Sequence, residues 1–123
     1  MNKEEILNLI DTLAIDKTEF WILSSSSLVI RNLFDKANDL DIAVTEKGLR
    51  QLSKKYELIS KGNNWYEVTD LVECVLDTKE DYKIEEYEGL QLLSLTEYYK
   101  HLKNLTREKD IIKRKIVEEQ LRN

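Results

Sequence analysis

Residues 21–44, WILSSSSLVIRNLFDKANDLDIAV, contain two short apolar runs separated by a segment whose apolar residues have helical spacing. Short apolar runs are typical of buried strands, and the second run, LDIAV, contains β-branched residues that favour strands. Four serines end the first run, and serine is a good N-cap for a helix. The stretch therefore predicts a strand, a helix and a second strand that returns beside the first.

Similar patterns assign the rest of the chain to helices and strands. The predicted elements are a helix over 2–14, a strand over 20–23, a helix over 25–34, a strand over 40–44, a helix over 45–56, a short strand over 57–60, a turn over 61–64, a strand or hairpin arm over 65–77, a helical turn and loop over 78–88, a strand over 89–95, and helices over 95–105 and 106–123. This order predicts an α+β fold, a small mixed sheet flanked by helices with a helical pair at the C-terminal end.

Length and composition limit the class of protein. A chain of 123 residues is expected to form one domain, and we see no boundary within residues 1–123. No apolar run is long enough to cross a membrane, and the acidic, well-patterned N-terminus does not resemble a signal peptide. The single cysteine, Cys74, excludes an internal disulfide and fits a reducing compartment. These features predict a cytoplasmic protein without membrane contact.

The charge of the chain is unevenly distributed. Residues 100–123 carry eight Lys and Arg against four Asp and Glu, a net charge of +4. The whole chain has a net charge of −5, so residues 1–99 hold a net charge of −9. An acidic chain is not favoured as a general nucleic-acid binder, although the basic segment leaves RNA open as a partner. The simplest interpretation is two solvated faces of opposite charge. The alternative is that the basic segment folds over an acidic site and meets an anionic substrate.

Two aspartates, Asp39 and Asp41, stand at the start of the second predicted strand. Side chains two residues apart on a strand point to the same face, so these carboxylates would lie close together and repel each other. A cation between them relieves this repulsion, and Mg²⁺ prefers hard oxygen ligands of this kind. Because such a pair also occurs by chance, its interpretation depends on what lies beside it.

The serine run supplies a feature that suits an anion beside the aspartates. A strand that turns directly into a helix leaves backbone N–H groups pointing at the turn, where they attract a phosphate. The hydroxyl groups can donate further hydrogen bonds to the same phosphate; the four serines are Ser24, Ser25, Ser26 and Ser27. The alternative is that these serines only cap the helix.

These residues resemble the signature of the DNA polymerase β-like nucleotidyltransferase superfamily. In that signature an apolar strand is followed by Gly-Gly or Gly-Ser, a short connecting segment, and Asp-x-Asp within a second apolar strand. Either Ser24-Ser25 or Ser25-Ser26 occupies the Gly-Ser position. The C-terminal LSLTEYYKHLKNLTREKDI is similar to a helix of small bacterial members, among them abortive-infection toxins and antibiotic-modifying enzymes. The resemblance covers residues 20–112.

The resemblance implies transfer of a nucleoside monophosphate from an NTP to an acceptor hydroxyl or phosphate, with two Mg²⁺ ions. Asp39 and Asp41 would hold the metal ions. A third carboxylate on a later strand would bind a metal ion or deprotonate the acceptor, and Glu73 matches that place best. Asp70 is the next choice, and Asp77 follows it.

The same resemblance implies positive charge near the phosphates. Lys100, Lys103 or Arg107 could supply it, and the alternative is that they form an ordinary exposed basic face. His101 is the only histidine, and a lone histidine on a helix is more often a surface or packing residue. The chain departs from the family at two places: it has no glycine in the serine run, and Lys113 stands where relatives usually have an aspartate.

Two other functions compete with the enzyme. The chain could be a degenerate, non-catalytic relative that binds a nucleotide or a partner protein through the same cleft. It could also be a toxin-type nucleotidyltransferase acting on tRNA or on a protein. A domain of this size has no obvious acceptor-binding domain, so a homodimer or a partner chain could complete the site.

Overall fold

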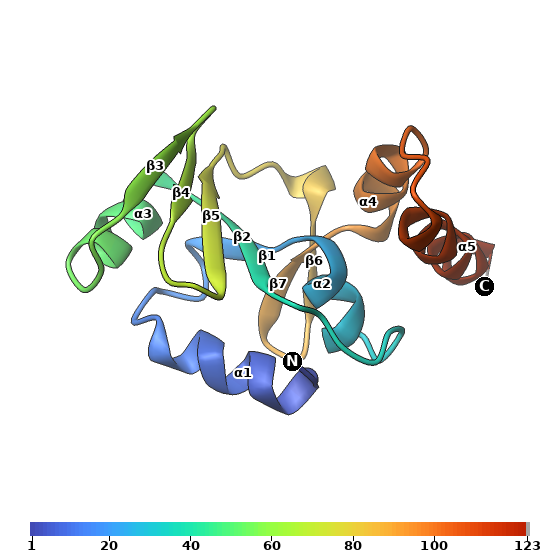
Figure 1. Ribbon diagram of the computed structural model, residues 1–123, viewed down its shortest axis with the longest axis horizontal. Helices are drawn as coiled ribbons and strands as arrows, with labels where there is room; N and C mark the ends of the chain where they lie inside the picture. Colours follow the sequence, from blue (N-terminus) through green and yellow to red (C-terminus); the bar gives the residue numbers. More distant parts are fainter. Residues whose placement is uncertain (123) are drawn as a thin grey trace.

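The computed structural model describes residues 1–122, over which the chain forms five α-helices and one seven-stranded mixed sheet (Figure 1). Asn123, the last residue of the predicted C-terminal helix, lies outside the described residues. The elements are α1 (Lys3–Thr12), β1 (Phe20–Ile22), α2 (Ser24–Ile30), β2 (Leu40–Val44), α3 (Glu46–Ser53), β3 (Ile59–Gly62), β4 (Trp65–Glu67), β5 (Val72–Leu76), the short 3₁₀ helix η1 (Asp81–Lys83), β6 (Ile84–Tyr87), β7 (Leu90–Leu93), α4 (Leu95–Leu102) and α5 (Glu108–Arg122). The predicted α+β class is confirmed.

The strand order in the sheet is β3-β4-β5-β2-β1-β7-β6. β1 and β2 are antiparallel neighbours, with Trp21 opposite Ala43, as the strand–helix–strand prediction required. β5 lies parallel to β2 on its other side, and β7 lies parallel to β1. The N-terminal ends of β2 and β5 therefore meet the C-terminal end of β1 at one edge of the central sheet.

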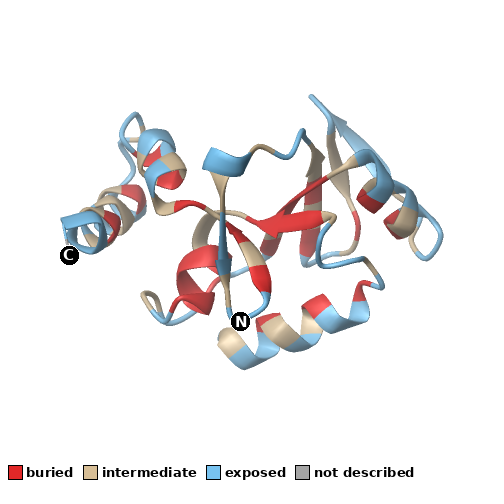
Figure 2. Cartoon of the chain, turned by 180° about the vertical axis from the view of Figure 1, so that it is seen from behind, coloured by how far each residue is buried: buried red, intermediate tan, exposed pale blue. Residues whose placement is uncertain are grey.

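The two faces of the sheet have different surroundings. Phe20, Ile22 and Ile42 point into the main core, which they share with buried residues of α1, α2 and α3. Buried residues accordingly concentrate in the central strands and in α2, whereas β3 is exposed along its length (Figure 2). Because side chains alternate along a strand, Trp21 and Ala43 point to the opposite face. That face meets the C-terminal helices, which pack on α2 through a second cluster of Leu28, Tyr98, Leu102 and Val117.

Three segments differ most from the sequence predictions. The helix predicted over 25–34 ends at Ile30, and Asn32 has a positive φ of 62°. The segment 65–77 forms two strands joined by a turn rather than one. The segment 78–88 was predicted as a helical turn and loop, but its second half is strand β6, which pairs with β7. Glu88 and Gly89 connect them with φ values of 52° and 81°, which suits a tight hairpin turn.

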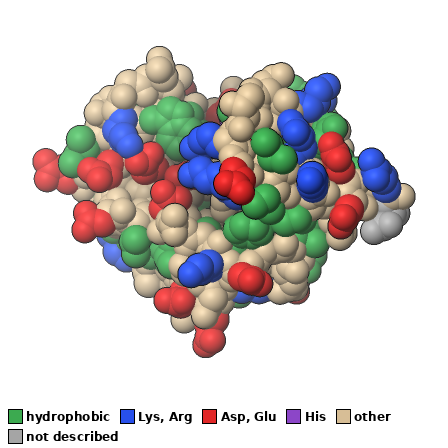
Figure 3. Space-filling view, turned by 45° about the vertical axis from the view of Figure 1, so that its right-hand side comes forward, with side chains coloured by type: hydrophobic (Ala, Val, Ile, Leu, Met, Phe, Trp, Pro, Cys, Tyr) green, Lys and Arg blue, Asp and Glu red, His purple; other side chains and the backbone are tan. Residues whose placement is uncertain are grey.

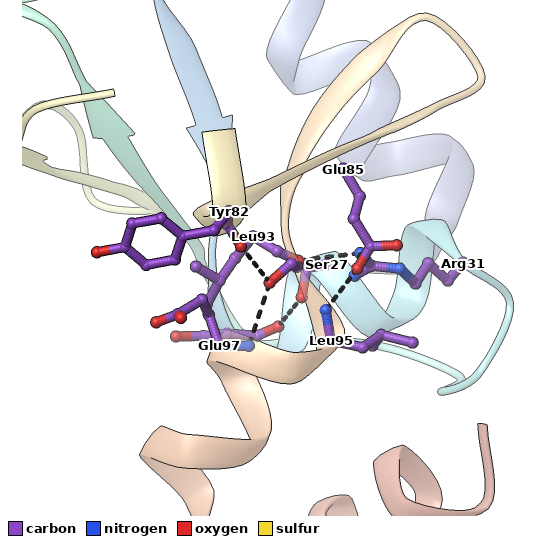
Figure 4. Close-up of polar contacts among 9 residues, drawn as sticks. Ser27, Arg31, Tyr82, Glu85, Leu93, Leu95 and Glu97 are labelled. Atoms are coloured by element: carbon purple, nitrogen blue, oxygen red, sulfur yellow. Dashed lines mark hydrogen bonds and ion pairs between the residues drawn. The ribbon is translucent and has the colours of Figure 1, made fainter. Parts of the chain in front are cut away.

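A buried arginine ties α2 to the segment that leads into α4 (Figure 4). Arg31 follows α2, is 9% exposed, and donates through Nη2 to the Leu93 carbonyl at 2.9 Å and to Glu85 at 3.4 Å. Glu85 also accepts a hydrogen bond from the backbone N–H of Leu95 at 2.6 Å. A cation is favourable at the C-terminal end of a helix. Arg31 therefore fixes how α2 and the start of α4 sit relative to each other.

Candidate functional site

The serine run lies at the junction of β1 and α2, directly across from the aspartates. The backbone N–H of Leu23 donates to the carbonyl of Asp41 at 2.9 Å, which aligns the end of β1 with the start of β2. Ser24 then adopts a left-handed conformation with φ of 55°. Glycine adopts this conformation without strain, whereas serine does not. Ser24 is therefore the position in the run where a glycine would fit the backbone best.

The four serines divide into two pairs with different surroundings. The Ser26 hydroxyl donates to the carbonyl of Asp39 at 2.8 Å, and the Ser27 hydroxyl donates to the carbonyl of Ser24 at 2.7 Å. Both residues are buried, so their hydroxyls join α2 to the turn before β2 and close the turn itself. Ser24 and Ser25 instead line an open cleft. The structure thus brings only half of the predicted phosphate-binding serines to the cleft.

This cleft has a volume of about 210 Å³ and joins the edge of the sheet to the C-terminal helices. Asp39 and Asp41 line it on the sheet side. Three basic residues line it from the side of α5, one just before the helix and two within its first two turns: Arg107, Lys109 and Lys113. In the space-filling view, Lys and Arg side chains lie directly beside Asp and Glu side chains near the hollow at the centre of the face (Figure 3). The basic segment therefore does fold against the acidic residues.

Arg107 is held in place by a buried carboxylate. Its Nε lies 2.5 Å from Oδ2 of Asp110, and its Nη2 lies 3.3 Å from Oδ1. Asp110 is 3% exposed, whereas the side chain of Arg107 is 63% exposed. A two-point pairing of this kind restricts the orientation of a guanidinium group. Asp110 thus positions a cation at the wall of the cleft.

The third predicted acid, Glu73, lies directly opposite Asp41 in the parallel register of β2 and β5. Burial, followed by the negative charges of Asp39 and Glu73, raises the pKa of Asp41 from 3.8 to about 6, against a smaller opposing effect of Lys61. The carboxylate of Glu73 forms an ion pair with Lys61 on β3. Glu73 is therefore a neighbour of the aspartate pair, and its carboxylate is engaged by a lysine.

The carboxylate oxygens at the sheet side of the cleft are ligands of the kind that Mg²⁺ prefers. Asp39 and Asp41 offer hard carboxylate oxygens in one cleft. Burial, and then the negative charges of Asp39 and Glu73, raise the pKa of Asp41, and a bound cation would oppose the effect of these charges. Within residues 1–122, no three His, Cys, Asp or Glu side chains lie close enough together to hold a metal ion as they stand. A metal ion that also bound Glu73 would compete with Lys61 for its carboxylate.

Other predicted site residues lie away from this cleft. Lys100 pairs with Glu97 at 3.1 Å on the exposed side of α4, and Lys103 is exposed at the end of that helix. Asp70 lies in the exposed turn between β4 and β5. Asp77 follows the opposite end of β5 from Glu73 and lies 3.9 Å from Lys83. Of the three predicted cations, only Arg107 reaches the cleft.

Tyr98 and His101 are cleft residues that the sequence did not single out as functional. Both also line a second cavity of about 270 Å³, whose walls include Trp21 and Trp65 and which shares Ser24 with the first cavity. Tyr98 is buried, and burial raises the pKa of its hydroxyl, which is within hydrogen-bonding reach of Ser25. Their helical spacing on α4 is the only sequence signal, and it does not distinguish them from packing residues.

Comparisons of this chain with protein-family models, with curated proteins and with solved structures found no match. Among residues 1–122, no helix is both long enough and apolar enough to cross a membrane. The residues of the cleft are therefore the basis for the function proposed below.

The left-handed conformation of Ser24 leads to a test of the turn. Ser24→Gly should raise the free energy of unfolding by about 0.5–1 kcal/mol, because glycine adopts a positive φ without strain. Ser25→Gly is the matched control, because Ser25 lies in α2 and does not have a positive φ. It should lower the free energy of unfolding by a similar amount. Urea denaturation measures both, and equal losses in the two variants would contradict strain at Ser24.

Proposed function

We propose that this chain has a nucleotidyltransferase-like fold and is a Mg²⁺-dependent nucleotidyltransferase. It would transfer a nucleoside monophosphate from an NTP to an acceptor hydroxyl or phosphate. The observation that carries the proposal is the cleft itself, where two aspartates, two serines at a strand–helix turn and three cations face one another. A polyanion bound through a divalent cation matches this combination of charges. The resemblance of residues 20–112 to the DNA polymerase β-like nucleotidyltransferases supports the same reaction.

The aspartate side of the cleft would bind the metal ions. Asp39 and Asp41 would hold Mg²⁺, and Glu73 would be the third carboxylate because its Cα pairs with that of Asp41. Bound Mg²⁺ polarises a phosphoryl oxygen and stabilises negative charge on the leaving pyrophosphate. When released from Lys61, Glu73 could accept the proton of the acceptor hydroxyl.

The serines and the cations of the cleft would bind the phosphate chain. Ser24 and Ser25 present hydroxyl groups to the cleft, and Arg107, Lys109 and Lys113 present positive charge. Burial, opposed by the charge of Asp110, lowers the pKa of Lys113, which stands where family members usually have an aspartate. A lysine there adds a cation to the phosphate side of the cleft instead of a further acid.

A non-catalytic relative that binds a nucleotide or a partner protein is the second candidate. Two observations favour it over an efficient enzyme: Ser24 takes a conformation that suits glycine, and the Glu73 carboxylate is occupied by Lys61. Both weaken the expected affinity for the nucleotide and its metal ion while leaving the cleft in place. The aspartate pair favours the enzyme, because these acids have no evident structural role.

The proposal also covers the acceptor substrate and the partner chains of this protein. A toxin-type enzyme acting on tRNA or a protein would use the cations of α5 as part of its contact surface. A homodimer or a partner chain would contribute to the acceptor-binding surface. A cytoplasmic location agrees with the single, buried Cys74.

Calorimetry with each of the four NTPs, with and without Mg²⁺, tests the proposal. We expect binding of at least one NTP that requires Mg²⁺ and is strengthened by Ser24→Gly, because the substitution removes backbone strain beside the phosphates. Lys100→Met is a suitable control, since Lys100 lies outside the cleft. Absence of NTP binding in both the wild type and Ser24→Gly would overturn the proposal that the chain is an enzyme, and would favour a degenerate relative.

A further inference from the structure

A row of three carboxylates crosses three adjacent strands on the open face of the sheet. Asp41 of β2 pairs with Glu73 of β5, and Glu73 pairs with Glu67 of β4. Residues paired directly across strands point to the same face, and like charges in such positions destabilise a sheet. The row continues outward from the aspartate pair, away from the cations of α5. It therefore needs a counter-ion on its outer side.

Lys61 is that counter-ion, and the backbone of β3 is shaped to deliver it. Ser60 pairs with Tyr66 and Gly62 pairs with Trp65, so Lys61 is the extra residue of a β-bulge. A bulge redirects the side chain that it carries. From this position the Nζ of Lys61 forms an ion pair with Glu73, and the charges of Glu67 and Asp41 also act on it.

The ion pair conflicts with full use of the carboxylates by a metal ion. A divalent cation at Asp39 and Asp41 would attract Glu73 and repel the ammonium group of Lys61. The ion pair engages Oε1 of Glu73, and the strands that carry Lys61 and Asp41 lie on opposite sides of β5. The ammonium group and a divalent cation would therefore compete for the same carboxylate.

We propose that Lys61 is a positioning residue, which holds Glu73 in the metal-free protein and is displaced from it when a divalent cation binds beside Asp41. The inference rests on the proposed function, because it assumes that the aspartate pair binds a cation. It adds a regulated acid to that site: Glu73 becomes a ligand or base only in the metal-bound state. The bulged hairpin thereby sets the affinity for the cation.

Titration with MgCl₂ alone, at low ionic strength, tests this role through binding rather than activity. Lys61→Met keeps the aliphatic stem but removes the charge. We expect it to bind Mg²⁺ about two- to fivefold more tightly than the wild type, the range for loss of a partly exposed ion pair. In EDTA the same variant should melt at a lower temperature, because the carboxylate row loses its counter-ion. Lys61→Arg should restore both properties toward the wild type.

Lys47→Met is the matched control, because Lys47 forms a surface ion pair with Asp16 at 3.9 Å on a different part of the molecule. It should leave Mg²⁺ affinity unchanged. If Lys61→Met behaves like Lys47→Met while the wild type binds Mg²⁺, the role of Lys61 is wrong and the proposed function stands. If Mg²⁺ binds only after Lys61→Met, and Asp41→Asn removes that gain, the inference is supported. If neither protein binds Mg²⁺, both the inference and the metal-dependent function fail.

Discussion

Asp41→Asn is expected to abolish the rise in melting temperature that Mg²⁺ and an NTP produce in the wild type. A ligand that binds only the folded state adds stability by mass action, about 2.7 kcal/mol at a concentration 100 times its dissociation constant. Asparagine keeps the shape of the side chain but removes a charge and a hard ligand. Asp70→Asn is the control, because Asp70 lies in an exposed turn outside the cleft. A metal-dependent shift that persists in Asp41→Asn would exclude this cleft as the metal site.

The same substitution should make the metal-free protein more stable at neutral pH. The pKa of Asp41 is raised from 3.8 to about 6 in the folded protein, so the folded state binds its proton more tightly than the unfolded state does. Stability from this group is present below pH 4 or so and is lost as the pH rises through about 6. The loss amounts to at most about 3 kcal/mol and is reduced by solvent screening, since Asp41 is only half-buried.

Urea denaturation in EDTA, between about pH 4 and pH 7.5, measures this difference. The stability advantage of Asp41→Asn over the wild type should be greatest near pH 7 and should disappear toward pH 4. Other carboxylates change the stability of both proteins alike, so the difference between them isolates Asp41. An advantage that is constant across the range would show that burial and the neighbouring acids do not raise this pKa.

The strand–helix–strand unit could be predicted because its pattern is local. Two apolar runs with a helical segment between them leave few ways to bury both strands, and β1 and β2 are neighbours as expected. The resemblance placed Glu73 on a strand near the aspartates, and its Cα does pair with that of Asp41, although its carboxylate is paired with Lys61. Strand β6 was missed because it lies at the edge of the sheet, where charged residues such as Glu85 and Glu86 are tolerated.

Other features of the cleft depend on tertiary structure. All four serines are equivalent in sequence, and only the backbone shows that Ser24 has the positive φ while Ser26 and Ser27 are used internally. Lys109 and Lys113 reach the cleft because the turn after α4 directs the start of α5 toward the sheet. Charge counting could identify the basic segment as a whole but could not distinguish Arg107, which lines the cleft, from Lys100, which does not.

Arg107→Met is expected to lower both the free energy of unfolding and the affinity for NTP. It leaves the carboxylate of Asp110, which is 3% exposed, without its ion-pair partner. An unpaired buried acceptor costs about 1–3 kcal/mol, and the exposure of Arg107 places the expected loss at the lower end. Lys109→Met removes an equal charge from the same wall of the cleft without isolating a carboxylate. It should weaken NTP binding but leave stability within about 0.5 kcal/mol of the wild type.

A double variant separates the two roles of Arg107. Arg107→Met combined with Asp110→Leu removes both partners, and replacing a buried ionic pair by apolar residues is often close to neutral for stability. We therefore expect the double variant to recover the stability lost in Arg107→Met, while its affinity for NTP stays low because the cation is still missing. Urea denaturation and calorimetry on the same samples give the two readouts. If NTP affinity returned together with stability, the guanidinium group of Arg107 would have no direct contact role: either it only supports the fold of α5, or the net charge of the cleft, which Asp110 also lines, sets the affinity.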